Sequence, residues 1–198
     1  MDSQEEVWTA MWLQELKDAG YVNDWFKILL PIHIFEPVEF YYNKVTVLKT
    51  KTKEELKKFT LLNDLDYTPD FQVTWTSAGM KHFVSRIADI EINPKSWFFC
   101  DNPLNTTLIE VKPNFDQNGK TAKFSIIQKI LWSVHKRFVD LILPEKLFEG
   151  TFMPKEAMPD FKYRKAPTGK NKGKKGPGDW KTDYVPKSLK EFINDKGK

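Results

Sequence analysis

The chain has 198 residues and a net charge of +4, and its 40% hydrophobic content with seven tryptophans excludes a wholly disordered protein. No apolar run reaches about 18 residues, which excludes a membrane-spanning helix, and the acidic opening MDSQEEVW argues against a secretory signal peptide. The single cysteine, Cys100, excludes an internal disulfide and suits a reducing cytoplasm. Three histidines (His33, His82, His135) are scattered without the spacing of metal ligands.

The positive charge is concentrated near the C-terminus. Residues 162–198 contain 12 basic and 4 acidic side chains, whereas residues 1–161 contain 19 basic and 23 acidic ones. Basic segments of this kind often bind the phosphate backbone of nucleic acids, but they also occur as solvated termini without a partner. We expect one domain over residues 1–160 and a basic, Gly-, Pro- and Lys-rich tail over residues 161–198. The tail residues expected to contact DNA are Lys170, Lys172, Lys174 and Lys175.

The first expected element is a helix from Gln4 to about Ala19. Ser3 and Glu6 have the spacing of a capping box, and Gly20 suits the C-terminal cap. The apolar stripe of this helix comprises Val7, Trp8, Met11, Trp12, Leu13 and Leu16.

Strand segments broken by Pro31 and Pro37 are expected next, in WFKILLPIHIFEPVEFYY. The following KTKTKEELKKFTLL is expected to be a charged, exposed link with room for one helical turn. FQVTWT, residues 71–76, alternates apolar and polar side chains as a half-buried strand does, and Pro69 suits the entrance to this strand.

Residues 77–106 give no clear pattern beyond a strand-like FVSRIADIEI. TLIEV, residues 107–111, is expected to be a strand, and residues 121–137 an amphipathic helix. FVDLIL, residues 138–143, is expected to be a further strand. The apolar face of the helix comprises Phe124, Ile127, Leu131 and Val134.

Three polar side chains stand at the ends of two expected strands. Asp70 opens the strand at residue 71, although aspartate is a poor strand former and is rarely buried without a partner. Glu110 and Lys112 are two residues apart on the next confident strand, so their side chains project from the same face. Two carboxylates offer hard oxygen ligands to Mg²⁺, and a lysine can orient water or stabilise charge on a phosphoryl group.

These residues resemble the motif of the PD-(D/E)XK nuclease superfamily: Pro69-Asp70, then Glu110-Val111-Lys112, then a helix. The resemblance implies a mixed α/β (α+β) fold with a restriction-endonuclease-like αβββαβ core, in which helices flank a central mixed sheet. More narrowly, SQEE and LQELKDAGYV in the first helix, with YTPDF, resemble small phage-encoded endonucleases related to Holliday-junction resolvases. The resemblance covers roughly residues 3–155 and leaves the tail outside the motif-bearing core.

The resemblance implies an Mg²⁺-dependent DNA endonuclease, for which Mn²⁺ can substitute, acting on branched or junction DNA in phage recombination, repair or processing. It also implies a homodimer and a location in the cytoplasm of a bacterial host. The catalytic residues implied are Asp70, Glu110, Lys112, Glu6 and Gln128. The metal ligands implied are Asp70, Glu110, Glu6 and the carbonyl of Val111.

Two further assignments concern the helix at residues 121–137. Gln128 and Trp132 match a Gln-x-x-x-aromatic pattern of the RecB-like nucleases, in which the glutamine helps to hold the site or the DNA. Lys123 and Lys129 are candidates for phosphate contacts. Exposed polar positions on a helix are also common without any such role.

Alternatives remain open at this level. Asp70 and Glu110 are 40 residues apart, so the motif needs an insertion, expected within residues 77–106. Asp89 and Glu91 are rivals for the second carboxylate, but Asn93 stands where the lysine would be needed. The protein could instead be a non-catalytic nucleic-acid-binding or virion-associated protein on a nuclease-like scaffold. The motif could also be a chance match in an α/β domain whose tail binds RNA or an acidic protein.

Overall fold

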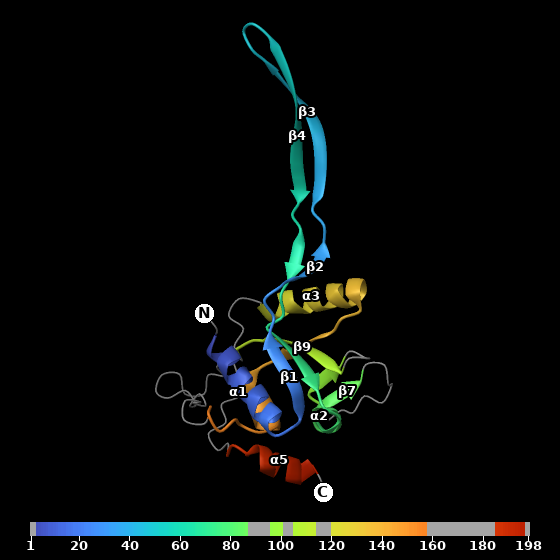
Figure 1. Cartoon of the computed structure of the whole chain (residues 1–198). Helices are drawn as coiled ribbons and strands as arrows, with labels where there is room; N and C mark the ends of the chain where they lie inside the picture. Colours follow the sequence, from blue (N-terminus) through green and yellow to red (C-terminus); the bar gives the residue numbers. More distant parts are fainter. Residues whose placement is uncertain (1–2, 87–95, 101–104, 114–119, 158–184, 197–198) are drawn as a thin grey trace, which may run out of the picture.

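The computed structural model describes residues 3–86, 96–100, 105–113, 120–157 and 185–196 (Figure 1). Within these residues the chain forms five helices and ten strands. The helices are α1 (Gln4–Asp18), α2 (Ser77–Phe83), α3 (Lys120–His135), α4 (Pro144–Gly150) and α5 (Leu189–Lys196). The strands are β1 (Val22–Lys27), β2 (Ile32–Phe35), β3 (Val38–Val47), β4 (Thr52–Leu62), β5 (Leu65–Tyr67), β6 (Phe71–Trp75), β7 (Val84–Arg86), β8 (Phe98–Cys100), β9 (Thr106–Val111) and β10 (Val139–Ile142).

The central sheet has four strands in the order β1–β6–β9–β10. β6 pairs antiparallel with both β1 and β9, whereas β10 runs parallel to β9. A parallel neighbour needs a crossover connection, and α3 lies in the segment that links β9 to β10. The expected mixed α/β class is therefore confirmed. None of the described helices is long and apolar enough to cross a membrane.

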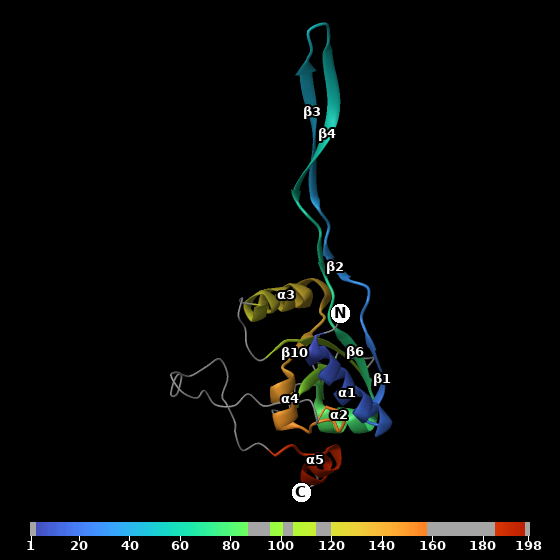
Figure 2. The ribbon, with the colours of Figure 1, turned by 90° about the vertical axis from the view of Figure 1, so that its left-hand side faces the viewer.

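Different helices cover the two faces of this sheet (Figures 1 and 2). α1 packs Trp12 and Leu16 into the main core, where they meet alternate side chains of β6 and β9. α3 packs Phe124 and Leu131 into a smaller core on the opposite face. The alternation of apolar and polar residues in FQVTWT, from which a half-buried strand was expected, matches the inward face of β6 toward the main core.

The start of α1 follows the expected capping box. The Ser3 hydroxyl accepts a hydrogen bond from the Glu6 backbone N–H at 3.2 Å, and a Glu6 carboxylate oxygen accepts from the Ser3 N–H at 3.5 Å. Gly20, just beyond the helix, has a positive φ of 79° that favours glycine. Local sequence chemistry therefore sets both ends of this helix.

A long two-stranded arm projects from the domain (Figures 1 and 2). β3 and β4 pair antiparallel from Val38 opposite Leu62 to Val47 opposite Thr52, and β2 pairs with β5 at the root. The expectation of a charged link with a helical turn at residues 49–62 is wrong, because β4 occupies most of it. Cross-strand pairs such as Phe40 with Phe59 stabilise the strands despite the lysine-rich composition.

The arm is an excursion that was not expected, separate from the insertion expected between Asp70 and Glu110. The arm lies between β1 and β6, before Asp70, whereas an insertion was expected within residues 77–106. In the described part of that range the chain forms α2, β7 and β8. Both excursions leave the pairing of β6 with β9 intact.

The expected boundary between a domain and a tail at residue 160 does not hold for residues 185–196. α5 packs Leu189 and Phe192 into the main core, and the Phe192 ring stacks on Phe83 with centroids 5.5 Å apart. The Met153 N–H donates to the Lys187 carbonyl at 3.0 Å. The lysine-rich composition hides the helical spacing of these apolar residues. The tail lysines Lys170, Lys172, Lys174 and Lys175 lie outside the described residues.

One carboxylate lies inside the main core. Asp140 on β10 is 6% exposed, and its Oδ2 accepts a hydrogen bond from the Phe99 N–H at 2.9 Å, which ties β10 to β8. Burial raises the pKa of Asp140 to about 8, against the opposing effect of that hydrogen bond. The carboxyl group is therefore held in its neutral form through much of the ordinary pH range.

We predict that Asp140→Asn makes the protein relatively more stable as the pH rises. The folded chain binds this proton more tightly than the unfolded chain, so the stability from protonation is full below about pH 4 and is lost as the pH approaches 8. The free energy of unfolding of the variant relative to wild type should rise by on the order of 2 kcal/mol between pH 5 and pH 9. Denaturant unfolding at both pH values measures this, with Asp18→Asn as the exposed control; an unchanged difference contradicts it.

Candidate active site

The pairing of β6 with β9 brings Asp70 next to Glu110. Phe71 lies opposite Ile109 in the antiparallel register, and the Asp70 N–H donates to the Ile109 carbonyl at 2.9 Å. The next pair along the ladder is Asp70 with Glu110, and directly opposite residues project from the same face. The Oδ2 atom of Asp70 accepts a hydrogen bond from the Val111 N–H at 2.7 Å. Residues 40 positions apart in the sequence are thus joined at one end of the sheet.

Both carboxylate oxygens of Glu110 are held by donors. The Tyr67 hydroxyl donates to Oε2 at 2.7 Å, and the Lys112 ammonium forms an ion pair with Oε1. Glu110 is 7% exposed, so a charge here needs partners. Burial, together with the hydrogen bond to Glu110, raises the pKa of Tyr67 and keeps the phenol as a donor. Glu110 and Lys112 share one face, as their spacing predicts.

Glu6 reaches the same cluster from the first turn of α1. Its Oε2 accepts from the Lys27 ammonium at 2.8 Å, while Oε1 completes the capping box. The Glu6 charge acts on Asp70, which places the N-terminus of α1 beside the end of β6. The capping role and the site position therefore coexist in one side chain.

The electrostatics of Asp70 reflect this crowding of carboxylates. Burial, and then the negative charges of Glu110 and Glu6, raise the pKa of Asp70 to about 6, against the Val111 N–H and the Lys112 charge. Within the described part of the chain, the Oδ1 atom of Asp70 accepts no hydrogen bond. The group combines a raised pKa with one oxygen that is open to a ligand, a pattern that is typical of functional sites.

The cluster is suited to a small hard cation with few protein ligands. Among the described residues, no group of three or more His, Cys, Asp and Glu side chains is arranged to hold a metal ion. Mg²⁺, however, commonly uses one or two carboxylates and takes its remaining oxygens from water and substrate phosphate. Asp70 and Glu110 provide such a pair, so the residues fit this ion.

Gln128, Lys123 and Lys129 lie on α3, whereas Val111 bonds to Asp70 within the cluster. The Gln128 amide donates to the Val139 carbonyl at 2.7 Å and thus ties α3 to β10. Lys123 and Lys129 are exposed on α3, and Trp132 is 40% exposed. Val111 contributes its N–H to Asp70 and buries its side chain in the main core. The rival acids Asp89 and Glu91 lie outside the described residues.

Sequence reasoning missed two members of the cluster, Tyr67 and Lys27. Tyr67 stands three residues before Asp70 in DYTPD, in a short strand that was not expected. Lys27 reaches the site because it pairs with Phe71 across β1 and β6. The aromatic residue beside the motif is a signal that could have been used, whereas the pairing of Lys27 depends on the register of distant strands.

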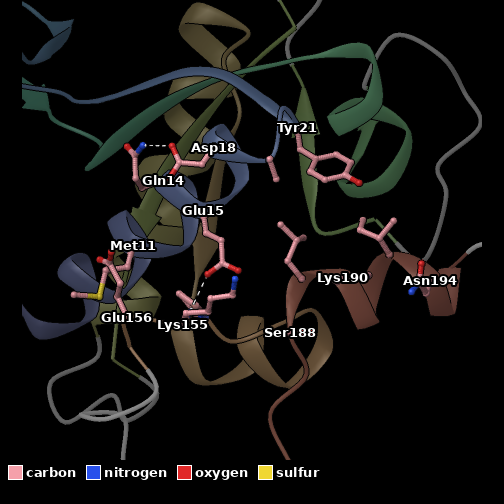
Figure 3. A pocket seen from close by; sticks show the side chains of 14 residues that line it. Met11, Gln14, Glu15, Asp18, Tyr21, Lys155, Glu156, Ser188, Lys190 and Asn194 are labelled. Atoms are coloured by element: carbon pink, nitrogen blue, oxygen red, sulfur yellow. Dashed lines mark hydrogen bonds between the residues drawn. The ribbon is translucent and has the colours of Figure 1, made fainter.

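A separate hollow of about 800 Å³ lies between α1 and α5 (Figure 3). Its lining includes Glu15, Asp18, Lys155 and Lys190, and Glu15 accepts a hydrogen bond from the Lys155 N–H at 2.9 Å. None of the residues clustered around Asp70 lines it. The hollow and the carboxylate cluster are therefore different features of the molecule.

Comparisons with known proteins do not extend this description, since no protein-family model, curated protein or solved structure matches the chain.

We predict that Gln128→Ala lowers the free energy of unfolding by about 1 kcal/mol, the usual effect of losing one hydrogen bond. The Val139 carbonyl would lose its donor at the junction of α3 and β10. Thermal unfolding with exposed Lys129→Ala as a control on the same helix measures the effect. A variant as stable as the control would show that the hydrogen bond does not stabilise the fold.

We predict that Asp70→Asn stabilises the protein at pH 8 by about 1 kcal/mol, a value reduced for solvent screening of this partly exposed group. The raised pKa means that stability from the protonated form is full below about pH 4 and is lost as the pH rises through about 6. An amide still accepts from the Val111 N–H but carries no charge. Unfolding at pH 4 and pH 8 should show the gain only at pH 8; an equal change at both would contradict it.

Proposed function

We propose that this protein is an Mg²⁺-dependent DNA endonuclease that hydrolyses phosphodiester bonds. The observation that carries the proposal is the meeting of Asp70, Glu110 and Lys112 at one end of the β6–β9 pair. Chance motifs at distant positions have no reason to converge on one partly buried cluster. The raised pKa of Asp70 further supports a site built for a cation rather than for stability.

We infer that the domain has the αβββαβ core of the PD-(D/E)XK superfamily. In support, α1, β1, β6, β9, α3 and β10 occur in that order along the chain, with the arm and the α2–β8 segment as additions. The sheet order and the parallel β9–β10 pair agree with this assignment. Glu6 of α1 is close enough for its charge to act on Asp70, in line with the site role that the resemblance implies for Glu6.

In this proposal Asp70 and Glu110 hold the ion, with Glu6 and the Val111 carbonyl in support. When bound, Mg²⁺ lowers the pKa of a water ligand and neutralises charge that develops on phosphate oxygens. Lys112, adjacent to Glu110, orients the attacking water and stabilises the negative transition state. The water oxygen would bond to phosphorus as its proton passes to solvent, the bond to the leaving sugar oxygen would break, and that oxygen would take a proton from solvent. Tyr67 and Lys27 keep Glu110 and Glu6 in position.

The substrate class within this proposal is branched or junction DNA, as for the resolvase-related endonucleases that the motifs resemble, with a role in phage DNA recombination, repair or processing. The alternative is a non-catalytic nucleic-acid-binding or virion-associated protein. The full engagement of both Glu110 oxygens by Tyr67 and Lys112 favours that alternative, because such a cluster can serve as a purely structural polar network.

A cleavage assay tests the proposal. Wild-type protein should cut a labelled four-way junction, a flap or a linear duplex with Mg²⁺ or Mn²⁺ and not with EDTA. Asp70→Asn, Glu110→Gln and Lys112→Ala should each lower the rate at least about 100-fold, because each removes a metal ligand or a transition-state contact. The matched control is Asp18→Asn, an exposed carboxylate at the far end of α1, which should cut as wild type does.

The outcomes separate the two functions. Binding without cutting on every substrate would leave the non-catalytic function. Cutting that survives Lys112→Ala and Asp70→Asn would place the activity elsewhere in the chain. The preferred substrate among the three would decide between a junction-selective enzyme and a general nuclease.

A further inference from the structure

The β3–β4 arm carries an exposed apolar surface. Exposed large hydrophobic side chains here are Val38, Phe40, Tyr41, Tyr42, Val45, Val47, Leu48, Leu56, Phe59, Leu61 and Leu62. Their exposed fractions run from 39% to 79%. A two-stranded hairpin alone is marginally stable in water, and apolar patches on monomers rarely exceed a few hundred Å². Neither view shows a described element packed along the outer half of the arm (Figures 1 and 2).

The register of the arm divides this surface between its two faces. Phe40 lies opposite Phe59, and Tyr42 follows on the same face. Tyr41 lies on the other face with Leu56, which is opposite Asn43. Both faces are therefore apolar. A ribbon that packs one face on protein and exposes the other to water would carry polar side chains on the exposed face.

Charge is also distributed along the arm, from an acidic root to a basic tip. Residues 45–53 at the tip contain three lysines and no acidic residue. Residues 32–39 and 60–67 at the root contain four acidic residues and no lysine or arginine. The tip lysines are Lys49, Lys51 and Lys53, and the root acids are Glu36, Glu39, Asp64 and Asp66. Glu39 forms an ion pair with Lys58, and Glu36 and Asp66 lie beside His33, which offsets part of the negative charge of the root. The remaining contrast between root and tip is complementary to a second copy that runs in the opposite direction.

We propose that the β3–β4 arm binds the arm of a second copy of this chain, side by side and antiparallel. In that arrangement the lysine tip of each arm lies against the acidic root of the other, as two-fold symmetry requires, and the apolar middles pack together. The four aromatic side chains, at roughly half exposure of about 150–250 Å² each, present about 400 Å² per copy. The seven aliphatic ones bring the total over both faces toward roughly 800 Å² per copy. A side-by-side pair buries one face of each arm, about half of this area, so the interface is at the small end of specific contacts and depends on the charge pairs at both ends.

A nucleic-acid groove is a poorer occupant. A two-stranded ribbon fits the major groove, and the tip lysines would suit phosphates. The four root acids would face the same phosphates, however, and the exposed aromatic and aliphatic side chains on both faces would meet few apolar partners there.

The arm pairing has a consequence for the candidate site. β5, at the root of the arm, ends at Tyr67, which donates to Glu110, and only two residues separate Tyr67 from Asp70. Pairing of two arms therefore fixes the position of two carboxylate clusters relative to each other. The association itself does not depend on the nuclease function.

Sedimentation equilibrium of the full chain tests the proposal. Wild type should be a dimer. The dissociation constant of the tip variant Lys49→Glu/Lys51→Glu/Lys53→Glu should be at least about 100-fold higher, because like charges would then meet at each root. The root variant Glu36→Lys/Glu39→Lys/Asp64→Lys should show the same increase. An equimolar mixture of the two should recover a heterodimer, since the reversed tip and the reversed root then face each other. Lys81→Glu/Lys146→Glu/Lys190→Glu, with the same charge change on exposed sites of the domain, should remain a dimer.

Three outcomes would overturn the proposal. The first is a wild-type chain that remains monomeric up to about 1 mM, the upper end of the dissociation constants of weak interfaces. The second is a homodimer that persists in both charge variants, and the third is a mixture in which no heterodimer forms. A monomer whose tip variant loses affinity for duplex DNA, with a smaller salt dependence, would assign the arm to DNA instead. Circular dichroism of each variant establishes that the domain remains folded.

Discussion

The register of β6 against β9 is the constraint on which the candidate site depends. The Asp70 N–H donates to the Ile109 carbonyl, and the Asp70 carboxylate accepts from the Val111 N–H. Asp70 is therefore bonded to the residues immediately before and after Glu110. A slip of one residue would move every side chain of a strand to the other face. Such a slip would separate the carboxylates and also expose the apolar side chains of β6 that fill the main core. The packing that stabilises the domain therefore also maintains the site.

The cluster itself is not built for stability. Burial, and then the negative charges of Glu110 and Glu6, raise the pKa of Asp70, and the Val111 N–H and the Lys112 charge offset this only in part. Local conflict of this kind is expected where function rather than folding selects the residues. Asp140 differs, since among the described residues it has one hydrogen-bond donor, the Phe99 N–H, and no carboxylate is among the causes of its pKa shift.

The elements that local patterns determine could be predicted from the sequence. The capping box of α1, the alternation of β6 and the amphipathic spacing of α3 all depend on residues close together in the chain. The convergence of Asp70 with Glu110 could be predicted only through a motif resemblance, because periodicity does not reveal strand order. The strand segments expected in residues 25–42 match β1, β2 and the start of β3. β4 and α5 were missed since lysine-rich composition masks strands and helices whose stability comes from pairing or tertiary packing. Lys27 was missed for the same reason, as its partner strand is distant in sequence.

The arm also affects how the chain reaches its folded state. β1 and β6 are neighbours in the sheet, yet Lys27 and its partner Phe71 are 44 positions apart, a separation that slows folding when the intervening chain is unstructured. The arm is a local hairpin closed at its tip by the Leu48 N–H and the Lys51 carbonyl, 2.8 Å apart, and hairpins form in about 1–10 μs. Once β3 has paired with β4 and β2 with β5, only a few residues remain between the ends of the β1–β6 loop. Zipping of the arm from its tip thus converts a distant strand pairing into a nearly local one.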